Sequence, residues 1–182
     1  MVSTQSIFQE EIDKYQKRLD RIDRNPSPTM LSANRLLYQA HLENNKAHLR
    51  WWQEGKPFIA LAGAGLETLF RAFGEYQILP MVYIADRLGT KKAEEAMDKV
   101  RAMGLPDYAC DRTMLFMPFA TAGVELPKPK IIITRTGSCN VVNNSFRAMG
   151  RLLDVPVYTI EVPFSDPYQE HLDYVVEQLR DL

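Results

Sequence analysis

The sequence contains few of the residues from which most metal and disulfide sites are built. Its 182 residues include 2 cysteines and 3 histidines. Two cysteines cannot form the disulfide framework of a small secreted domain, and neither belongs to a CxxC motif, which excludes a zinc knuckle and a thioredoxin-type motif. Cys110 and Cys139 lie 139 − 110 = 29 residues apart, so the thiols can meet only through folding. In a reducing cytosol the simplest interpretation is a pair of small buried thiols.

An excess of either charge is also missing, as are long apolar runs. The chain has 22 Lys and Arg against 23 Asp and Glu, so its total charge favours neither nucleic acid nor an anionic membrane as a partner. No apolar stretch approaches the roughly 20 residues that a membrane-spanning helix requires. The first residues are polar and acidic, unlike a signal peptide. We therefore expect a cytoplasmic protein.

The first third of the chain has the apolar period of helices. Residues 5–23 place apolar side chains three or four apart, and the prolines after them predict a break before a second helix that reaches Trp52. The predicted apolar side of the first helix holds Phe8, Ile12, Tyr15, Leu19 and Ile22, and that of the second holds Leu36, Leu37, Ala40, Ala47 and Trp51. We expect these helices to form an arm over residues 1–55.

From residue 58 the pattern changes to short apolar runs, each followed by a turn and a helical segment. Strands are predicted at 58–62, 81–85, 130–134 and 156–160, with helices at 66–75, 90–103, 141–153 and 167–182. This alternation, with Ile- and Val-rich strands, is typical of a parallel sheet covered on both faces. Residues 56–182 are therefore predicted to form an α/β domain with a four-stranded parallel sheet, flavodoxin-like or Rossmann-like.

Ligands of open parallel sheets bind beyond the carboxyl ends of the strands, and the two cysteines fall at or near that edge. Cys139 follows a predicted strand and a Gly-Ser turn and comes just before a helix, whose amino terminus stabilises the thiolate that metal ligation and nucleophilic attack require. Cys110 has Arg112 nearby, which can place positive charge beside a thiolate or an anionic cluster.

A different ligand is indicated by the turn after the first strand. Gly63 and Gly65, with Asp86 at the end of the second strand, imitate a dinucleotide fingerprint and predict NAD binding in an oxidoreductase domain. The third fingerprint position is Thr68 in place of Gly or Ala, which weakens this interpretation. The histidines lack a third ligand, so no histidine metal site is expected. A third interpretation is a non-catalytic docking domain whose arm binds a partner.

Six motifs in order resemble the 2-hydroxyacyl-CoA dehydratase and benzoyl-CoA reductase family, from about residue 58 onward. The motifs are AGAGLETLFRAFG at 62–74, VYIAD at 82–86, PDYACDR at 106–112, PKP at 127–129, GSCN at 137–140, and VP at 155–156 running to VP at 162–163. No motif is specific by itself, and the resemblance rests on their order and spacing.

The resemblance implies an oxygen-sensitive subunit with two α/β domains that holds a [4Fe-4S] cluster through three cysteines and pairs with a related subunit. An ATP-hydrolysing activator would deliver one low-potential electron, so that a bound acyl-CoA thioester forms a ketyl radical anion before loss of a group or ring reduction. Cys110 and Cys139 match the first two cluster ligands, and Asp86 matches a position that can hold an acid near the substrate.

The sequence departs from the family in two respects. The third cysteine and the second α/β domain are missing, and the turn after the first strand is Gly-Ala-Gly where the family has a serine-rich turn. We therefore expect an amino-terminal portion or a shortened subunit, whose cluster another domain or chain must complete. Alone, the chain is expected to be inactive and unable to hold a stable [4Fe-4S] cluster.

Overall fold

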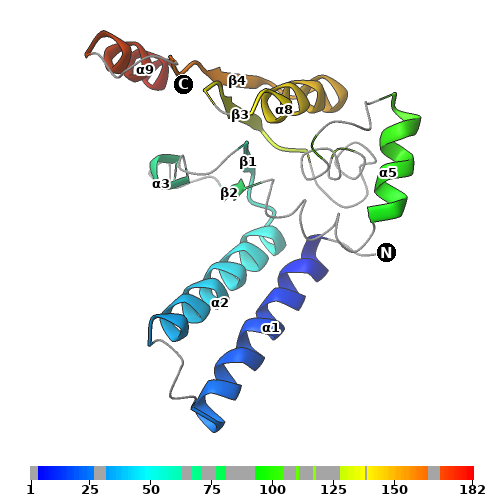
Figure 1. Ribbon diagram of the computed structural model, residues 1–182, viewed down its shortest axis with the longest axis vertical. Helices are drawn as coiled ribbons and strands as arrows, with labels where there is room; N and C mark the ends of the chain where they lie inside the picture. Colours follow the sequence, from blue (N-terminus) through cyan, green and yellow to red (C-terminus); the bar gives the residue numbers. More distant parts are fainter. Residues whose placement is uncertain are drawn as a thin grey trace. The chain divides into compact units, whose positions relative to one another are not determined.

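The computed structural model divides into two compact units, Met1–Lys56 and Pro57–Leu182 (Figure 1). The structure describes residues 4–26, 32–62, 67–70, 77–80, 93–104, 110, 117, 128–137, 139–163 and 169–182. Each unit has its own buried apolar cluster.

The first unit is a helical hairpin of α1 (Thr4–Arg24) and α2 (Ser32–Gln53). Tyr15 and Leu19 of α1 pack with Leu42 of α2 in its apolar cluster, and Phe8 is also buried. The apolar face predicted for α1 is confirmed at these positions. Helices this long still need tertiary packing in water, and the two cover each other's apolar side chains.

The predicted apolar face of α2 is wrong. Leu36 and Leu37 are 69% and 51% exposed, whereas Leu42, Asn45 and His48 are buried. The buried face of α2 is therefore rotated about the helix axis relative to the predicted one, and aromatic stacking explains the difference. The His48 ring stacks on Phe8 with centroids 5.4 Å apart, and the His41 ring stacks on Tyr15 at 4.8 Å. Both histidines therefore belong to the contact between the two helices.

The second unit is a mixed α/β structure around an open parallel sheet. Its strands are β1 (Phe58–Leu61), β2 (Gln77–Pro80), β3 (Ile131–Arg135) and β4 (Val157–Ile160). Hydrogen bonding joins them in the order β2-β1-β3-β4, and every neighbouring pair is parallel. The predicted parallel α/β class is confirmed.

Helices cover both faces of this sheet, as the alternation of side chains along a strand requires. On one face Ile59, Ile133 and Ile160 form the core with Phe70 of α3 (Glu67–Phe70), and Val175 and Leu179 of α9 (Gln169–Asp181) pack against it. The opposite face of β3 and β4 contacts α8 (Asn140–Leu153) (Figure 1).

The predicted strands at 58–62, 130–134 and 156–160 agree with β1, β3 and β4 to within one or two residues. The predicted strand at 81–85 lies outside the described residues, and β2 instead occupies Gln77–Pro80. The predicted helices at 90–103, 141–153 and 167–182 agree with α5 (Ala93–Ala102), α8 and α9. Of the predicted helix at 66–75, the described part is α3.

Candidate functional site

The strand order places a topological switch between β1 and β3. The chain leaves β1 for β2 on one side of it and leaves β3 for β4 on the other, so the two connections diverge. Divergent connections leave a crevice at the carboxyl edge of an open parallel sheet, where ligands bind. The described part of this edge includes the end of β3, the turn after it and the segment after β4. We call these residues, 134–137, 139 and 161–163, the carboxyl-edge site.

Thr136 fastens the two segments of the carboxyl-edge site to each other. Its backbone N–H donates to the Ile160 carbonyl at 2.9 Å, and its hydroxyl oxygen accepts a 2.8 Å hydrogen bond from the Val162 backbone N–H. The turn between β3 and α8 is therefore held by the end of β4 and by Val162 of the segment after it, 26 residues further along the chain.

Gly137 makes the close approach of these segments possible. Its φ is +75°, in the left-handed region that favours glycine, and an added Cβ would lie 3.3 Å from the Val162 Cβ. The backbone conformation therefore favours glycine at this position, and the space beside Val162 is tight for any side chain.

Cys139 is exposed and is the N-cap residue of α8. Its φ of −70° and ψ of 121° are extended, and its carbonyl accepts from the Asn143 N–H at 3.3 Å, the first bond of the helix. The Cys139 side chain makes no cap hydrogen bond of its own. The first amides of a helix stabilise negative charge, here on the thiol sulfur or on a group bound beside it.

Two further polar residues end β3. Thr134 is fully buried, and its hydroxyl donates to Asn143 Oδ1 of α8 at 3.4 Å, which ties the helix to the strand. Arg135 follows it, and its Nε atom is buried without a hydrogen-bond partner among the described residues. An unsatisfied donor on a charged group is costly, so Arg135 makes this edge of the sheet favourable for an acceptor with negative charge.

The segment after β4 is fixed by α9. The Gln178 side chain accepts from the Glu161 N–H at 2.7 Å and donates to the Glu161 carbonyl at 2.9 Å. The Tyr174 hydroxyl donates to Glu161 Oε2 at 2.7 Å. This hydrogen bond, together with desolvation and the charge of Glu161, raises the pKa of Tyr174 above its usual 10.0.

The other predicted site residues are placed less completely. Cys110 is exposed, so the interpretation of both thiols as buried is wrong. Residues 105–109 and 111–116 around it lie outside the described part, as do Asp86, Gly63 and Gly65. The NAD prediction therefore stays a prediction.

Within the described ranges no group of three or more His, Cys, Asp or Glu side chains gathers as a metal site would require.

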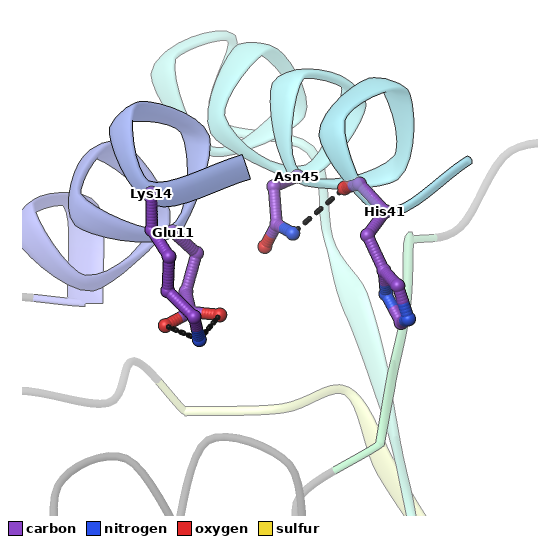
Figure 2. Close-up of polar contacts among 4 residues, drawn as sticks. All are labelled: Glu11, Lys14, His41 and Asn45. Carbon is purple, nitrogen blue, oxygen red and sulfur yellow. Dashed lines mark hydrogen bonds and ion pairs between the residues drawn. The ribbon is translucent and has the colours of Figure 1, made fainter. Parts of the chain in front are cut away.

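Two buried polar side chains of the helical hairpin, Glu11 and Asn45, make polar contacts with partners in their own helices (Figure 2). Lys14 Nζ lies 3.0 and 2.9 Å from the two carboxylate oxygens of Glu11, and Asn45 Nδ2 donates to the His41 carbonyl at 2.8 Å. Figure 2 shows each of these contacts inside a single helix, α1 or α2. We assign these contacts to the packing of the hairpin, because pairing within the helix lowers the cost of burying these polar groups.

Sequence reasoning gave no role to Thr136, Arg135 or Gln178. A charged residue at the end of an apolar strand is a signal that the sequence does carry, and it points to Arg135. Thr136 and Gln178 act through partners 26 and 17 residues away, which no local pattern reveals.

The described helices include none that is both long and apolar enough to cross a bilayer.

Comparison with protein-family models and with curated proteins finds no match to this chain.

Proposed function

We propose that the chain is part of an iron-sulfur subunit of a radical acyl-CoA enzyme of the 2-hydroxyacyl-CoA dehydratase or benzoyl-CoA reductase type. In this proposal Cys110 and Cys139 supply two thiolates to a [4Fe-4S] cluster, and Asp86 binds substrate or transfers a proton. A related α/β subunit and an ATP-hydrolysing activator are its partners. The sheet is a four-stranded flavodoxin-like one, for which the order β2-β1-β3-β4 is the supporting observation.

The observation that carries the proposal is the position of Cys139. The thiol is exposed at the amino terminus of α8, beside the switch between β1 and β3, and makes no cap hydrogen bond to the helix. Thiolates are the usual ligands of iron-sulfur clusters, and a helix amino terminus favours the thiolate form. A purely structural cysteine has no need of this exposure.

The surrounding residues would hold such a group in position. Thr136 and Gly137 fix the turn that leads to Cys139, and α9 fixes the facing segment through Gln178. Arg135 supplies positive charge close in sequence, which suits a cluster whose thiolate ligands make it anionic. Once bound, the cluster would pass single electrons to an acyl-CoA thioester.

Anaerobic reconstitution with iron and sulfide tests this function. An excess of a small thiol such as 2-mercaptoethanol replaces the ligands that another domain or chain would supply. We expect charge-transfer absorption in the visible range and an EPR signal after reduction, both lost in Cys110→Ala and in Cys139→Ala. Asn144→Ala, an exposed change on α8, is the matched control and keeps both signals.

The proposal fails if the signals persist when both cysteines are replaced by alanine, because the small thiol alone would then hold the cluster. It fails equally if the unmodified chain binds no iron under these conditions.

A further inference from the structure

An open groove of about 640 Å³ lies between α8 and β4. It is lined by both polar and apolar groups, and its charged members are Arg147, Arg151 and Asp154. In the described sheet β4 pairs with β3 alone, so the groove lies along an edge strand. The volume falls in the range of sites for small organic ligands.

The two arginines of the groove are one helical turn apart on α8. Like charges at this spacing repel each other, and neither guanidinium has an ion-pair partner in the described part of the chain. The Arg147 Nε–H donates to the Thr159 hydroxyl of β4 at 3.3 Å, which positions the guanidinium and leaves its two amino groups for another acceptor.

The remaining charges near the groove offset each other. Asp154 is the C-cap of α8, and its carboxylate lies 3.9 Å from Lys128 Nζ. The last carbonyls of α8 are also engaged, because the Asp154 N–H donates to Arg151 O and the Val155 N–H donates to Gly150 O. Two positive charges therefore remain, and the negative end of the helix is partly neutralised.

Gly150 gives the groove its shape. An added Cβ on Gly150 would lie 2.1 Å from the Val157 Cγ2, so the absence of a side chain lets α8 approach the edge strand at this point. The close contact fixes the helix on the strand beside Arg147 and Arg151, which line the same groove.

We propose that this groove binds a small molecule that carries a phosphate group. Planar guanidinium groups bind phosphate oxygens through paired hydrogen bonds, and two of them match the double negative charge of a phosphate monoester. The space left by a phosphate suits an attached organic group such as a nucleoside. This site is separate from the carboxyl-edge site and does not depend on the proposed function.

Calorimetric titration of the full chain with AMP, adenosine and inorganic phosphate tests the site. We expect AMP to bind with a Kd at or below about 1 mM. Phosphate should bind more weakly and adenosine not at all, and added salt should weaken the binding of AMP. Arg147→Gln and Arg151→Gln should each weaken AMP binding roughly tenfold or more, because each removes charged hydrogen bonds. Arg180→Gln, an exposed change on α9, should leave it unaltered.

If phosphate binds as tightly as AMP, the site binds the free anion. The proposed phosphate recognition is then retained, and the attached organic group is not part of the ligand. The proposal is overturned if neither AMP nor phosphate gives saturable heat, or if both glutamine variants bind AMP as well as the unmodified chain. Circular dichroism of each variant shows whether it remains folded.

Discussion

A single hydroxyl group joins the turn after β3 to the segment after β4. The Val162 N–H has no strand partner at this position, and Thr136 Oγ1 accepts from it at 2.8 Å. Since even a half-buried amide without an acceptor costs free energy, this contact stabilises the sheet at the edge where Cys139 lies.

We predict that Thr136→Val destabilises the fold by about 1–2 kcal/mol, because valine keeps the shape of threonine and removes the acceptor. Urea unfolding followed by fluorescence measures the change. Thr136→Ser retains the hydroxyl and should cost less. Equal losses in the two variants would show that the methyl group, and not the hydrogen bond, provides the stability.

Tyr174 provides a pH-dependent contact at the same edge. Its raised pKa means that the folded state holds the phenol proton more tightly than the unfolded chain does, whose tyrosine ionises near 10.0. The hydrogen bond to Glu161 therefore stabilises the fold fully below pH 10.0 and is lost as the pH rises through the higher, folded-state pKa.

We predict that Glu161→Ala lowers the pKa of Tyr174 towards 10.0, because it removes both the acceptor and the charge. Phenolate absorbance follows the titration, and subtraction of the Tyr174→Phe curve isolates this residue. Glu177→Ala, an exposed change on α9, is the control. A Tyr174 titration that Glu161→Ala leaves unaltered contradicts the prediction.

At the scale of elements, the close approach of α8 to β4 requires a glycine at position 150. Gly150 lies inside the helix, where glycine is intrinsically poor, yet the position has no room for a Cβ beside Val157. We predict that Gly150→Ala destabilises the fold by about 1–2 kcal/mol, since the overpacking cost exceeds the gain in helix propensity of about 1 kcal/mol.

Thermal unfolding of a double variant checks the reason for this loss. Val157→Ala removes the Cγ2 atom that the new Cβ would meet, so the double variant should lose less stability than the sum of the two single changes. Strict additivity would show that the Gly150 to Val157 contact is not the cause.

Elements with a strong local pattern were predictable from the sequence, and those set by distant partners were not. The apolar runs of β1, β3 and β4 and the period of α1 each follow from local side chains. The buried face of α2 does not, because stacking on Phe8 and Tyr15 of the other helix selects His48 and His41 over two leucines. At the site, the sequence identified the turn that holds Cys139, while the hydrogen bonds that fix that turn join residues far apart in the chain.

For the whole molecule, the two units have separate buried clusters, and damage to one should stay within it. Leu42 is 4% exposed in the hairpin cluster. We predict that Leu42→Ala costs the hairpin about 2–5 kcal/mol, because it leaves a cavity. Amide hydrogen exchange should accelerate in α1 and α2 far more than in β1 and β3.

Leu36→Ala is the matched control, because it makes the same chemical change at a side chain that is 69% exposed. The free energy of opening obtained from hydrogen exchange should change by no more than about 0.5 kcal/mol in this variant. If exchange accelerates equally in both units of the Leu42→Ala variant, the two units unfold together, which contradicts the prediction.

The pairing of β1 with β3 has a consequence for how the sheet assembles. Ile59 lies beside Ile131, so the partners are 131 − 59 = 72 residues apart in the chain, and their contact must close a long loop. In the finished fold β1 is buried along its whole length. During synthesis its edge towards β3 stays uncovered until residues 131–135 have been made. The interval exposes an apolar strand edge to other chains, so aggregation of nascent or refolding protein should begin at β1 and not at β4.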